Sequence, residues 1–361
     1  MRWDYVKTVR LVVGLCQRLV AFAGNSCLLV PVLVAFLSGQ VDGGLVTFGS
    51  GANQFSLEFV PIGNAGNSAD VLRGAVNYEY GMMKYEVTRA AIEKYNADYG
   101  TANGLEIPVS DMTPWGGNDP DKPARYLSWH MAARFVNWLN TSQGYHEAYK
   151  FSGSGVDDAH SLWTASEAGY DPDNLYRNSL AHFVLPDVDE WYKAAFYDPV
   201  LQVYYDYAVG GDTVPVSVYG GTDSGTAVYG LPDHVGPALA TNAGGLSPCG
   251  VMAMDGNVRE FMETEIDGVN DDVNDQVFVA GGSWLSPAGE IAAGSFLFVP
   301  KNGVGCVYGG FRVVDLQAAS VPEPGFTLTL CCMFGGFALR QWTGRQGGRR
   351  RVRRKDVTSP A

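Results

Sequence analysis

The segment Gly-Asn-Val-Arg-Glu-Phe at residues 256–261 is the part of the chain whose residue types and spacing best suit chemistry. A tight turn of this composition directs backbone carbonyls and the carboxylate of Glu260 toward one point. Such oxygens suit a hard cation such as calcium, which takes six to eight of them. The alternative is that Glu260 caps a turn or forms an ion pair with Arg259 or Arg312. The residues alone leave both interpretations open.

The histidines do not predict a metal site. They are His130, His146, His160, His182 and His234. None form a pair three or four positions apart, the spacing that presents two ligands on one helix face. The nearest cluster, His146 and Glu147 with His160, is interpreted as ordinary surface side chains. The aspartate-rich run at 267–275 does not fit the spacing of a calcium loop and is interpreted as a solvated loop.

Other catalytic and redox signatures are missing from the sequence. No Gly-x-Ser-x-Gly elbow, phosphate-binding loop or His-Glu-x-x-His motif occurs. Cys16 and Cys27 lie in the N-terminal segment, and Cys331 and Cys332 lie in the C-terminal segment. Only Cys249 and Cys306 lie between residues 45 and 316, which excludes a disulfide scaffold. Those two could pair in an oxidising compartment, but their separation in space does not follow from the sequence.

Composition and charge limit the class of protein. The 361 residues are 46% hydrophobic and 17% charged, with 45 glycines, which excludes a disordered chain and favours a loop-rich globule. The net charge is −13, and 12 of the 25 basic residues lie in residues 1–39 and 340–361. The body between them is therefore strongly acidic. Such a body repels nucleic acid and anionic membranes, so neither is expected as its partner.

The N-terminal segment has the order of a secretory signal. Basic residues precede an apolar run at 27–37, which ends at the small and polar Ser38, Gly39 and Gln40. The apolar run is shorter than the about 20 residues needed to span a bilayer. We predict a cleaved signal peptide at residues 1–39. An uncleaved anchor and a buried core helix are the alternatives.

The C-terminal segment has the features of a second targeting signal. Val-Pro-Glu-Pro at 321–324 precedes an apolar run at 326–339 and an arginine-rich run at 349–355. Prolines form an extended spacer, and arginines favour the cytoplasmic side of a membrane. The segment 321–361 resembles the PEP-CTERM sorting signal of bacteria. The resemblance implies an exosortase-type processing enzyme as partner. A nucleic-acid tail or a solvated charge run is the alternative for the arginines.

That resemblance also implies a location. The apolar run would be a transmembrane helix that holds the protein transiently in the inner membrane before processing. The protein would then reach the cell surface or the medium. The run is short for a span, so the helix must extend into Gln341 and Trp342 or be only transient.

The sequence between the two terminal segments predicts one α+β domain with a high content of irregular structure. Alternation and turn residues predict strands at 55–63 and 80–87. Thr88 and Ser128 are expected to cap helices through Asn96 and over 129–140, and Asp187 with Glu190 forms a capping-box pattern. In the second helix an apolar stripe recurs at 132, 135, 136 and 139.

Five segments in order resemble the formylglycine-generating enzyme, or sulfatase-modifying factor, family. They are Tyr-Glu-Val-Thr at 85–88, Leu-Ser-Trp with Trp-Leu-Asn at 127–140, Leu-Pro-Asp-Val-Asp-Glu-Trp at 185–191, Gly-Asn-Val-Arg-Glu-Phe at 256–261, and Gly-Gly-Ser-Trp with Gly-Phe-Arg-Val at 281–313. The resemblance implies a single sulfatase-modifying-factor domain of C-type-lectin-like fold over residues 45–316.

The resemblance also implies roles for particular residues. The carbonyls of Ala253, Gly256 and Val258 and the side chain of Glu260 fall on the family's structural calcium site. Its oxygen-dependent enzymes bind Cu(I) with two cysteines five positions apart, and those places hold Ser286 and Ile291 here. Neither supplies the soft thiolate that Cu(I) requires, so no copper is expected and no catalytic residue is assigned. The iron-binding histidines and the helical domain of the ergothioneine-type branch are absent as well.

These features favour an exported, non-catalytic surface protein that has a binding or structural role, with a peptide or a glycan as ligand. A divergent formylglycine-generating-type oxidoreductase, or another enzyme acting on an exported protein, is the alternative. It predicts a cleft with polar groups near Ser283, Ser286 and Arg312. A third interpretation is a maturation accessory that binds a partner peptide without oxidising it.

Overall fold

The structure is a computed structural model of the chain and describes residues 44–71, 73–302 and 306–317. The predicted signal peptide at 1–39 and the predicted sorting signal at 321–361, with its apolar run, lie outside the described residues. In the part that is described, no helix combines the length and the apolar character needed to cross a membrane.

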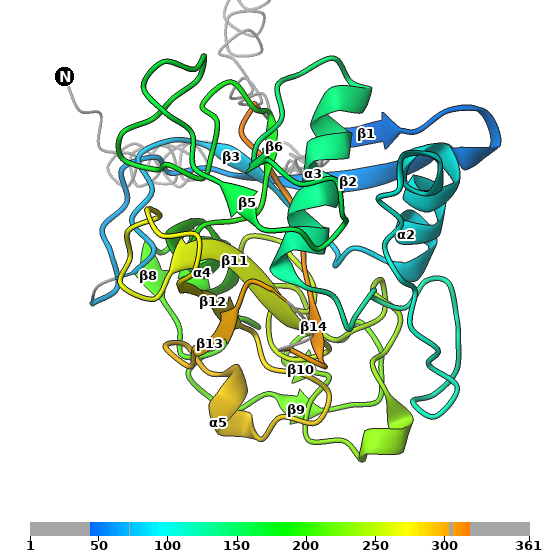
Figure 1. Cartoon of the computed structure of the whole chain (residues 1–361). Coiled ribbons are helices and arrows are strands. Elements are labelled where there is room, and N and C mark those ends of the chain that lie inside the picture. The colour runs from blue at the N-terminus through cyan, green and yellow to red at the C-terminus, as the bar shows by residue number, and fades with distance from the viewer. Residues whose placement is uncertain (1–43, 72, 303–305, 318–361) are drawn as a thin grey trace, which may run out of the picture. The chain divides into compact units, whose positions relative to one another are not determined.

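Five strands form an antiparallel sheet in the order β1-β2-β3-β15-β6 (Figure 1). Their bounds are β1 (Gly44–Phe48), β2 (Phe55–Ile62), β3 (Tyr80–Met83), β6 (Phe183–Val184) and β15 (Val314–Asp315). The strand predicted at 55–63 matches β2, but β3 is shorter than the predicted 80–87. It ends at Met83 because the carbonyl of Lys84 leaves the sheet and accepts from the amide of Met252 at 2.9 Å.

A second sheet has the order β13-β12-β11-β14, with β14 parallel to β11. Its strands are β11 (Arg259–Glu265), β12 (Gln276–Ala280), β13 (Leu297–Pro300) and β14 (Gly309–Gly310). The register of β11 against β12 shifts between Phe261 and Glu265. Three two-stranded pairs complete the strands: β4 (Lys150–Phe151) with β5 (His160–Ser161), β7 (Tyr197–Asp198) with β8 (Val203–Tyr204), and β9 (Val216–Ser217) with β10 (Thr226–Ala227).

The helices begin where their capping residues predict. Thr88 accepts a hydrogen bond from the amide of Ala91, and Ser128 from that of Met131. Asp187 and Glu190 form a capping box. The helices are α2 (Arg89–Tyr95), α3 (Trp129–Ser142), α4 (Val188–Phe196) and α5 (Ala288–Ile291), with the short turns η1 (Gly51–Asn53), η2 (Asn96–Gly100), η3 (Thr101–Asn103) and η4 (Asp233–Val235). Short elements joined by long loops confirm the predicted irregular content.

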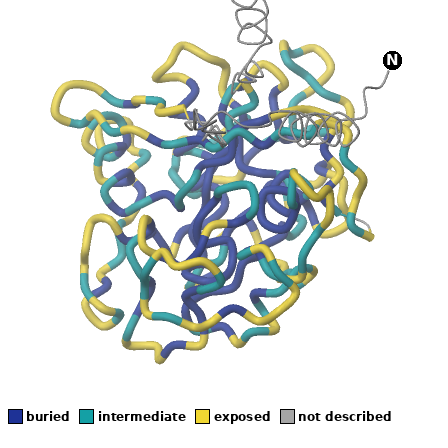
Figure 2. The backbone as a smooth tube through the Cα atoms, turned by 180° about the vertical axis from the view of Figure 1, so that it is seen from behind, coloured by how far each residue is buried: buried dark blue, intermediate teal, exposed yellow. Residues whose placement is uncertain are grey.

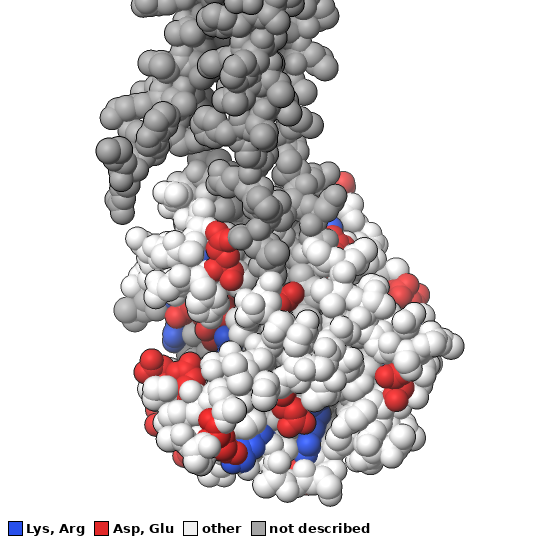
Figure 3. All heavy atoms as spheres, turned by 90° about the horizontal axis from the view of Figure 1, so that it is seen from above, with Lys and Arg blue, Asp and Glu red and all other residues white. Residues whose placement is uncertain are grey.

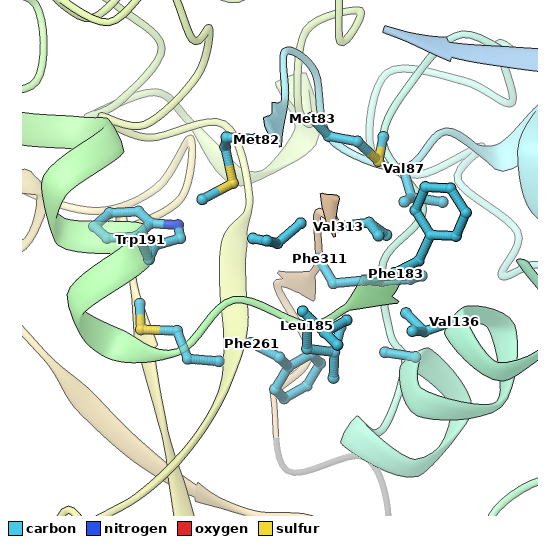
Figure 4. Close-up of a cluster of buried hydrophobic side chains, with 14 of the residues drawn as sticks. Met82, Met83, Val87, Val136, Phe183, Leu185, Trp191, Phe261, Phe311 and Val313 are labelled. Atoms are coloured by element: carbon cyan, nitrogen blue, oxygen red, sulfur yellow. The ribbon is translucent and has the colours of Figure 1, made fainter. Parts of the chain in front are cut away.

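The main core lies where α3 and α4 pack against strands of both sheets. The predicted apolar stripe of α3 is fully buried. Figure 2 shows the buried backbone in the middle of the described part and exposed loops around it. Ten core side chains labelled in Figure 4 come from segments far apart in the sequence: Met82, Met83, Val87, Val136, Phe183, Leu185, Trp191, Phe261, Phe311 and Val313. A second, smaller apolar cluster contains Met252, Ala253 and Val258 and packs around the turn that leads into β11.

Candidate functional site

The turn at 253–258 has an unusual backbone conformation. Ala253 and Asn257 have φ values of 61° and 63°, and Gly256 has 102°. Asn257 compensates for its strained backbone with its side chain, which donates to Glu86 Oε2 at 2.6 Å and accepts from the amide of Ala238 at 2.8 Å. Burial raises the pKa of Glu86 well above its usual value, and the nearby carboxylate of Glu260 raises it further.

Glu260 lies at the start of β11 and is fully buried beside Arg312. Arg312 donates from Nη2 to Oε1 at 2.5 Å and from Nε to Oε2 at 2.6 Å. The indole of Trp191 donates to Oε2 at 2.7 Å. Arg312 also donates to the carbonyls of Met83 and Met252, each at 2.9 Å. The ion pair therefore connects β11, β3 and the strained turn.

This geometry confirms the interpretation in which Glu260 pairs with Arg312. Both carboxylate oxygens accept hydrogen bonds from the Arg312 guanidinium, and the role of Glu260 as a calcium ligand stays a prediction. A calcium ion at the carbonyls of Ala253, Gly256 and Val258 stays a prediction, and no step below depends on one.

The two positions at which the resemblance places cysteines, 286 and 291, hold other buried side chains. Ser286 is 2% exposed, and its hydroxyl donates to Glu290 Oε2 at 2.8 Å and accepts from the amide of Ser283 at 3.0 Å. Arg259 pairs with the same Glu290 oxygen at 2.6 Å. Ile291 is 1% exposed and belongs to a small apolar cluster. A hydroxyl and a butyl group offer no soft ligand for Cu(I).

Of the polar groups expected near a divergent active site, Ser283 and Ser286 come together, with 3.4 Å between their hydroxyl oxygens. Within the described residues, the structure gives Arg312 no hydrogen bond to Ser283 or Ser286. Both serines are buried, and the hydroxyl of Ser286 accepts from the amide of Ser283 and donates to Glu290. The two cavities described below are lined by neither of them.

Two histidines meet that the sequence did not pair. His160 of β5 lies 3.4 Å from His130 of α3, measured from Nδ1 to Nε2, whereas His146 is exposed. Burial, together with the charge of Lys301 and the His130 ring, lowers the pKa of His160 to about 2. Their spacing of 30 positions leaves no local pattern, which is why the pair was missed.

The aspartate-rich loop brings carboxylates close together, whereas Cys249 and Cys306 do not pair with each other. Cys249 and Cys306 are free thiols, and burial raises their pKa values to about 12 and about 11. Oxygens of Glu265, Asp267 and Asp275 lie within 4.8 Å of one another. Glu265, however, already accepts from Lys301 and from two loop amides.

The cavities of the described part of the chain include a polar one and an apolar one. The polar cavity, of about 310 Å³, is lined by residues that include Arg73, Asp171, Asp173, Arg177, Asp187 and Asp189. The apolar cavity, of about 350 Å³, is lined by residues that include Leu45, Leu57, Met83, Tyr85, Glu86 and Ala91. The sequence marked Asp187 only as a helix cap and did not indicate either cavity.

A buried ion network forms the floor of the polar cavity. Arg177 donates to both oxygens of Glu190 at 3.0 and 2.9 Å and to Glu263 at 3.1 Å. Tyr78 donates to Glu190 at 2.6 Å, and Tyr149 donates to Glu263 at 2.8 Å. Burial raises the pKa of Glu263, but its pairing with Arg177 opposes that rise.

An α+β domain with short helices, curled sheets and this Gly-Asn-Val-Arg-Glu core is of the C-type-lectin-like, sulfatase-modifying-factor type. The chain belongs to the family described as the sulfatase-modifying factor enzyme 1-like domain, whose model matches residues 40–316. The predicted fold class is thereby confirmed.

Solved structures share this fold at low identity. The crystal structure of CarF has a TM-score of 0.50 and 20% identity, and the match covers 72% of this chain and 98% of that one. Variable protein 1 of Treponema denticola has a TM-score of 0.50 and 18% identity, with 77% and 99% covered. At such identities the likeness shows the fold alone. No curated protein matches the sequence.

Proposed function

We propose that this chain is an exported, non-catalytic protein that uses the sulfatase-modifying-factor scaffold for a binding or structural role at the cell surface. The proposal rests on the residues that occupy positions 286 and 291, where the family's oxygen-dependent enzymes have their copper-binding cysteines. Ser286 is buried in hydrogen bonds to Glu290 and Ser283, and Ile291 is buried among apolar side chains. Family membership supplies the fold, while chemistry depends on site residues that this chain replaces.

Export is proposed from the chain's ends. The charged, apolar and small-residue order of 1–39 supports a signal peptide, and Val-Pro-Glu-Pro with its apolar and arginine-rich runs supports a PEP-CTERM signal. The protein would be held transiently in the inner membrane and released to the surface by an exosortase-type enzyme. Mass spectrometry of the mature protein tests this: we expect new ends near residue 39 and near residues 322–324. Intact ends on surface-located protein would contradict it.

The non-catalytic role is tested by metal loading of the purified protein. We expect the wild type to retain no Cu(I) against a competing chelator and to leave a cysteine-containing peptide unoxidised in air. The double variant Ser286→Cys/Ile291→Cys restores two thiols at the family spacing, and its Cu(I) uptake provides the positive control. Stoichiometric copper or iron in the wild type, or oxidation of the peptide, would overturn the proposal.

A further inference from the structure

Residues 150–161 form a hairpin that has one buried side chain. Its strands, β4 and β5, are two residues long and enclose a loop whose residues are exposed or half-buried. The structure describes all of these residues, and among them only His160 is buried, with 2% of its surface exposed. A two-stranded hairpin is at best marginally stable by itself. The position of the hairpin therefore depends on what holds His160 and the loop in place.

The hairpin docks on α3 (Figure 1). Arg134 of α3 donates to two carbonyls of the loop at 2.7 and 3.1 Å, and its guanidinium carbon lies 3.7 Å from the centroid of the Phe151 ring. His130 of α3 lies 3.6 Å from Asp157 of the loop, measured from Nδ1 to Oδ1. On its other side, Nε2 of His130 faces Nδ1 of His160 at 3.4 Å. Two imidazoles therefore meet where the hairpin contacts the helix.

His160 is surrounded by aromatic rings and by a cation. Its ring centroid lies 4.9 Å from that of Trp129, 5.5 Å from that of His130 and 4.4 Å from that of Tyr176. Lys301 Nζ lies 4.5 Å from the centroid of the same Tyr176 ring. Within the described residues, His160 Nε2 has no hydrogen-bond partner. Such a pocket suits a neutral imidazole and opposes a protonated one.

The nearby carboxylates contact other groups. Glu265 accepts from Lys301 at 2.7 Å and from two loop amides at 3.1 and 3.2 Å. Asp157 faces Nδ1 of His130, whereas His160 faces Nε2 of that ring. His130 also lies in the first turn of α3, where the helix dipole disfavours a cation. Burial, Lys301 and His130 together lower the pKa of His160 to about 2.

A histidine outside the interior takes up a proton far more readily, because the pKa of an exposed histidine is about 6.5. On the face that Figure 3 shows, acidic side chains outnumber basic ones, and the whole chain has a net charge of −13. A surface of that sign favours the protonated form. Between these two pKa values the undocked hairpin binds more protons than the docked one. Docking is therefore favoured above pH 6.5 and is weakened as the pH falls.

We propose that the hairpin at 150–161 is an acid-sensitive switch: protonation of His160 releases it from α3 while the remainder of the domain stays folded. The released hairpin uncovers the rings of Trp129 and Tyr176, against which His160 packs. The switch results from a histidine at the one buried position of the hairpin, where an apolar side chain would dock at any pH. It goes beyond the proposed binding or structural role and does not depend on it.

Hydrogen exchange of the full-length protein at pH 7 and pH 5, measured by mass spectrometry of peptic fragments, tests the proposal. Each rate is divided by the intrinsic rate at that pH, so that the ratio reports opening of the structure. We expect fragments from 150–161 to lose protection by about 25-fold. That change follows from a pKa of about 6.5 in the open form and about 2 in the docked form. Fragments from α4 and β12 should keep their protection.

Variants identify the titrating group. His160→Phe keeps an aromatic ring at the buried position and removes the group that takes up the proton, so fragments from 150–161 should stay protected at pH 5. His160→Leu, a second replacement that cannot be protonated, should behave in the same way. His146→Gln and His234→Gln, at exposed positions, are the matched controls and should lose protection at 150–161 as the wild type does.

Unchanged protection of 150–161 in the wild type at pH 5 would overturn the proposal. An equal loss in every fragment would overturn it too, because it would indicate unfolding of the whole domain. A loss that persists in His160→Phe or His160→Leu would place the titrating group elsewhere and contradict the assigned role of His160. The wild-type measurement remains decisive even if neither variant folds. None of these outcomes bears on Cu(I) retention or peptide oxidation, which test the proposed function.

Discussion

Replacing Arg312 by methionine tests the ion pair that connects the strained turn to both sheets. Methionine fills part of the space but removes the charge and the donors to Glu260, Met83 and Met252. Both members of the pair are 0% exposed, so Glu260 would remain as a buried carboxylate whose one donor among the described residues is the indole of Trp191. Breaking a buried pair from one side costs about 3–5 kcal/mol. We expect Arg312→Met to lose that much free energy of unfolding.

A second variant separates the charge from the volume. Arg312→Met/Glu260→Leu leaves no uncompensated charge, so it should be more stable than Arg312→Met alone. A coupling free energy of about 2 kcal/mol is expected, because directly bonded residues are not additive. Lys150→Met is the control: it breaks an exposed ion pair with Glu167, where both side chains are about one-third exposed, and should cost at most about 1 kcal/mol.

Urea unfolding followed by tryptophan fluorescence and circular dichroism gives these free energies. Additive costs in the double variant, or a loss below about 1 kcal/mol for Arg312→Met, would refute the role assigned to the pair. Calcium titration of the wild type and of Glu260→Gln adds a separate arm. Stabilisation by calcium that disappears in Glu260→Gln would show that Glu260 binds calcium and that the ion pair gives way to the metal.

Two further predictions concern a buried histidine and a crowded glycine. The pKa of His160 is about 2 in the folded chain and 6.5 in the unfolded one, so stability that is present above pH 6.5 is lost as the pH falls. Replacing His160 by phenylalanine (His160→Phe) should reduce the loss of unfolding free energy between pH 7 and pH 5 by about 2 kcal/mol. The exposed variant His146→Gln is the control, and an unchanged loss in His160→Phe would contradict the prediction. A Cβ at Gly256 would lie 2.2 Å from the carbonyl oxygen of Val228, whereas a Cβ at Gly117, whose backbone is also left-handed, would meet no atom within 4 Å. Urea unfolding should therefore show Gly256→Ala to be about 1–3 kcal/mol less stable than Gly117→Ala. Equal losses of stability in the two variants would contradict the clash.

Local features of the fold were predictable because their causes are local. Thr88, Ser128 and Asp187 each accept a hydrogen bond from an amide three positions on, so residue type and spacing suffice to mark a helix start. The apolar stripe of α3 is likewise a matter of helical period. The end of β3 was not predictable in this way, because it depends on Met252, which reaches Lys84 from far along the chain.

The candidate sites escaped local patterns for the same reason. Glu260 and Arg312 are separated by 52 positions, and Arg177 and Glu263 by 86. The sequence could state that Glu260 either binds calcium or pairs with an arginine, but only the fold decides which donor reaches its oxygens. The absence of a cysteine at position 286 could be inferred from the sequence because the family's spacing marks that position. The hydrogen bond of Ser286 to Glu290 could not, because no motif singles out Glu290.

Buried cations explain how a domain with so little regular structure can hold together. Long loops leave backbone carbonyls without partners from a helix or a sheet, and a buried carbonyl needs a donor. Among the described residues, every buried lysine and arginine donates to at least one backbone carbonyl: Arg89, Lys122, Arg125, Arg177, Lys193, Lys301 and Arg312. None of these contacts involves Ser286 or Ile291, so the donors that satisfy these carbonyls are independent of the residues at the two thiol positions.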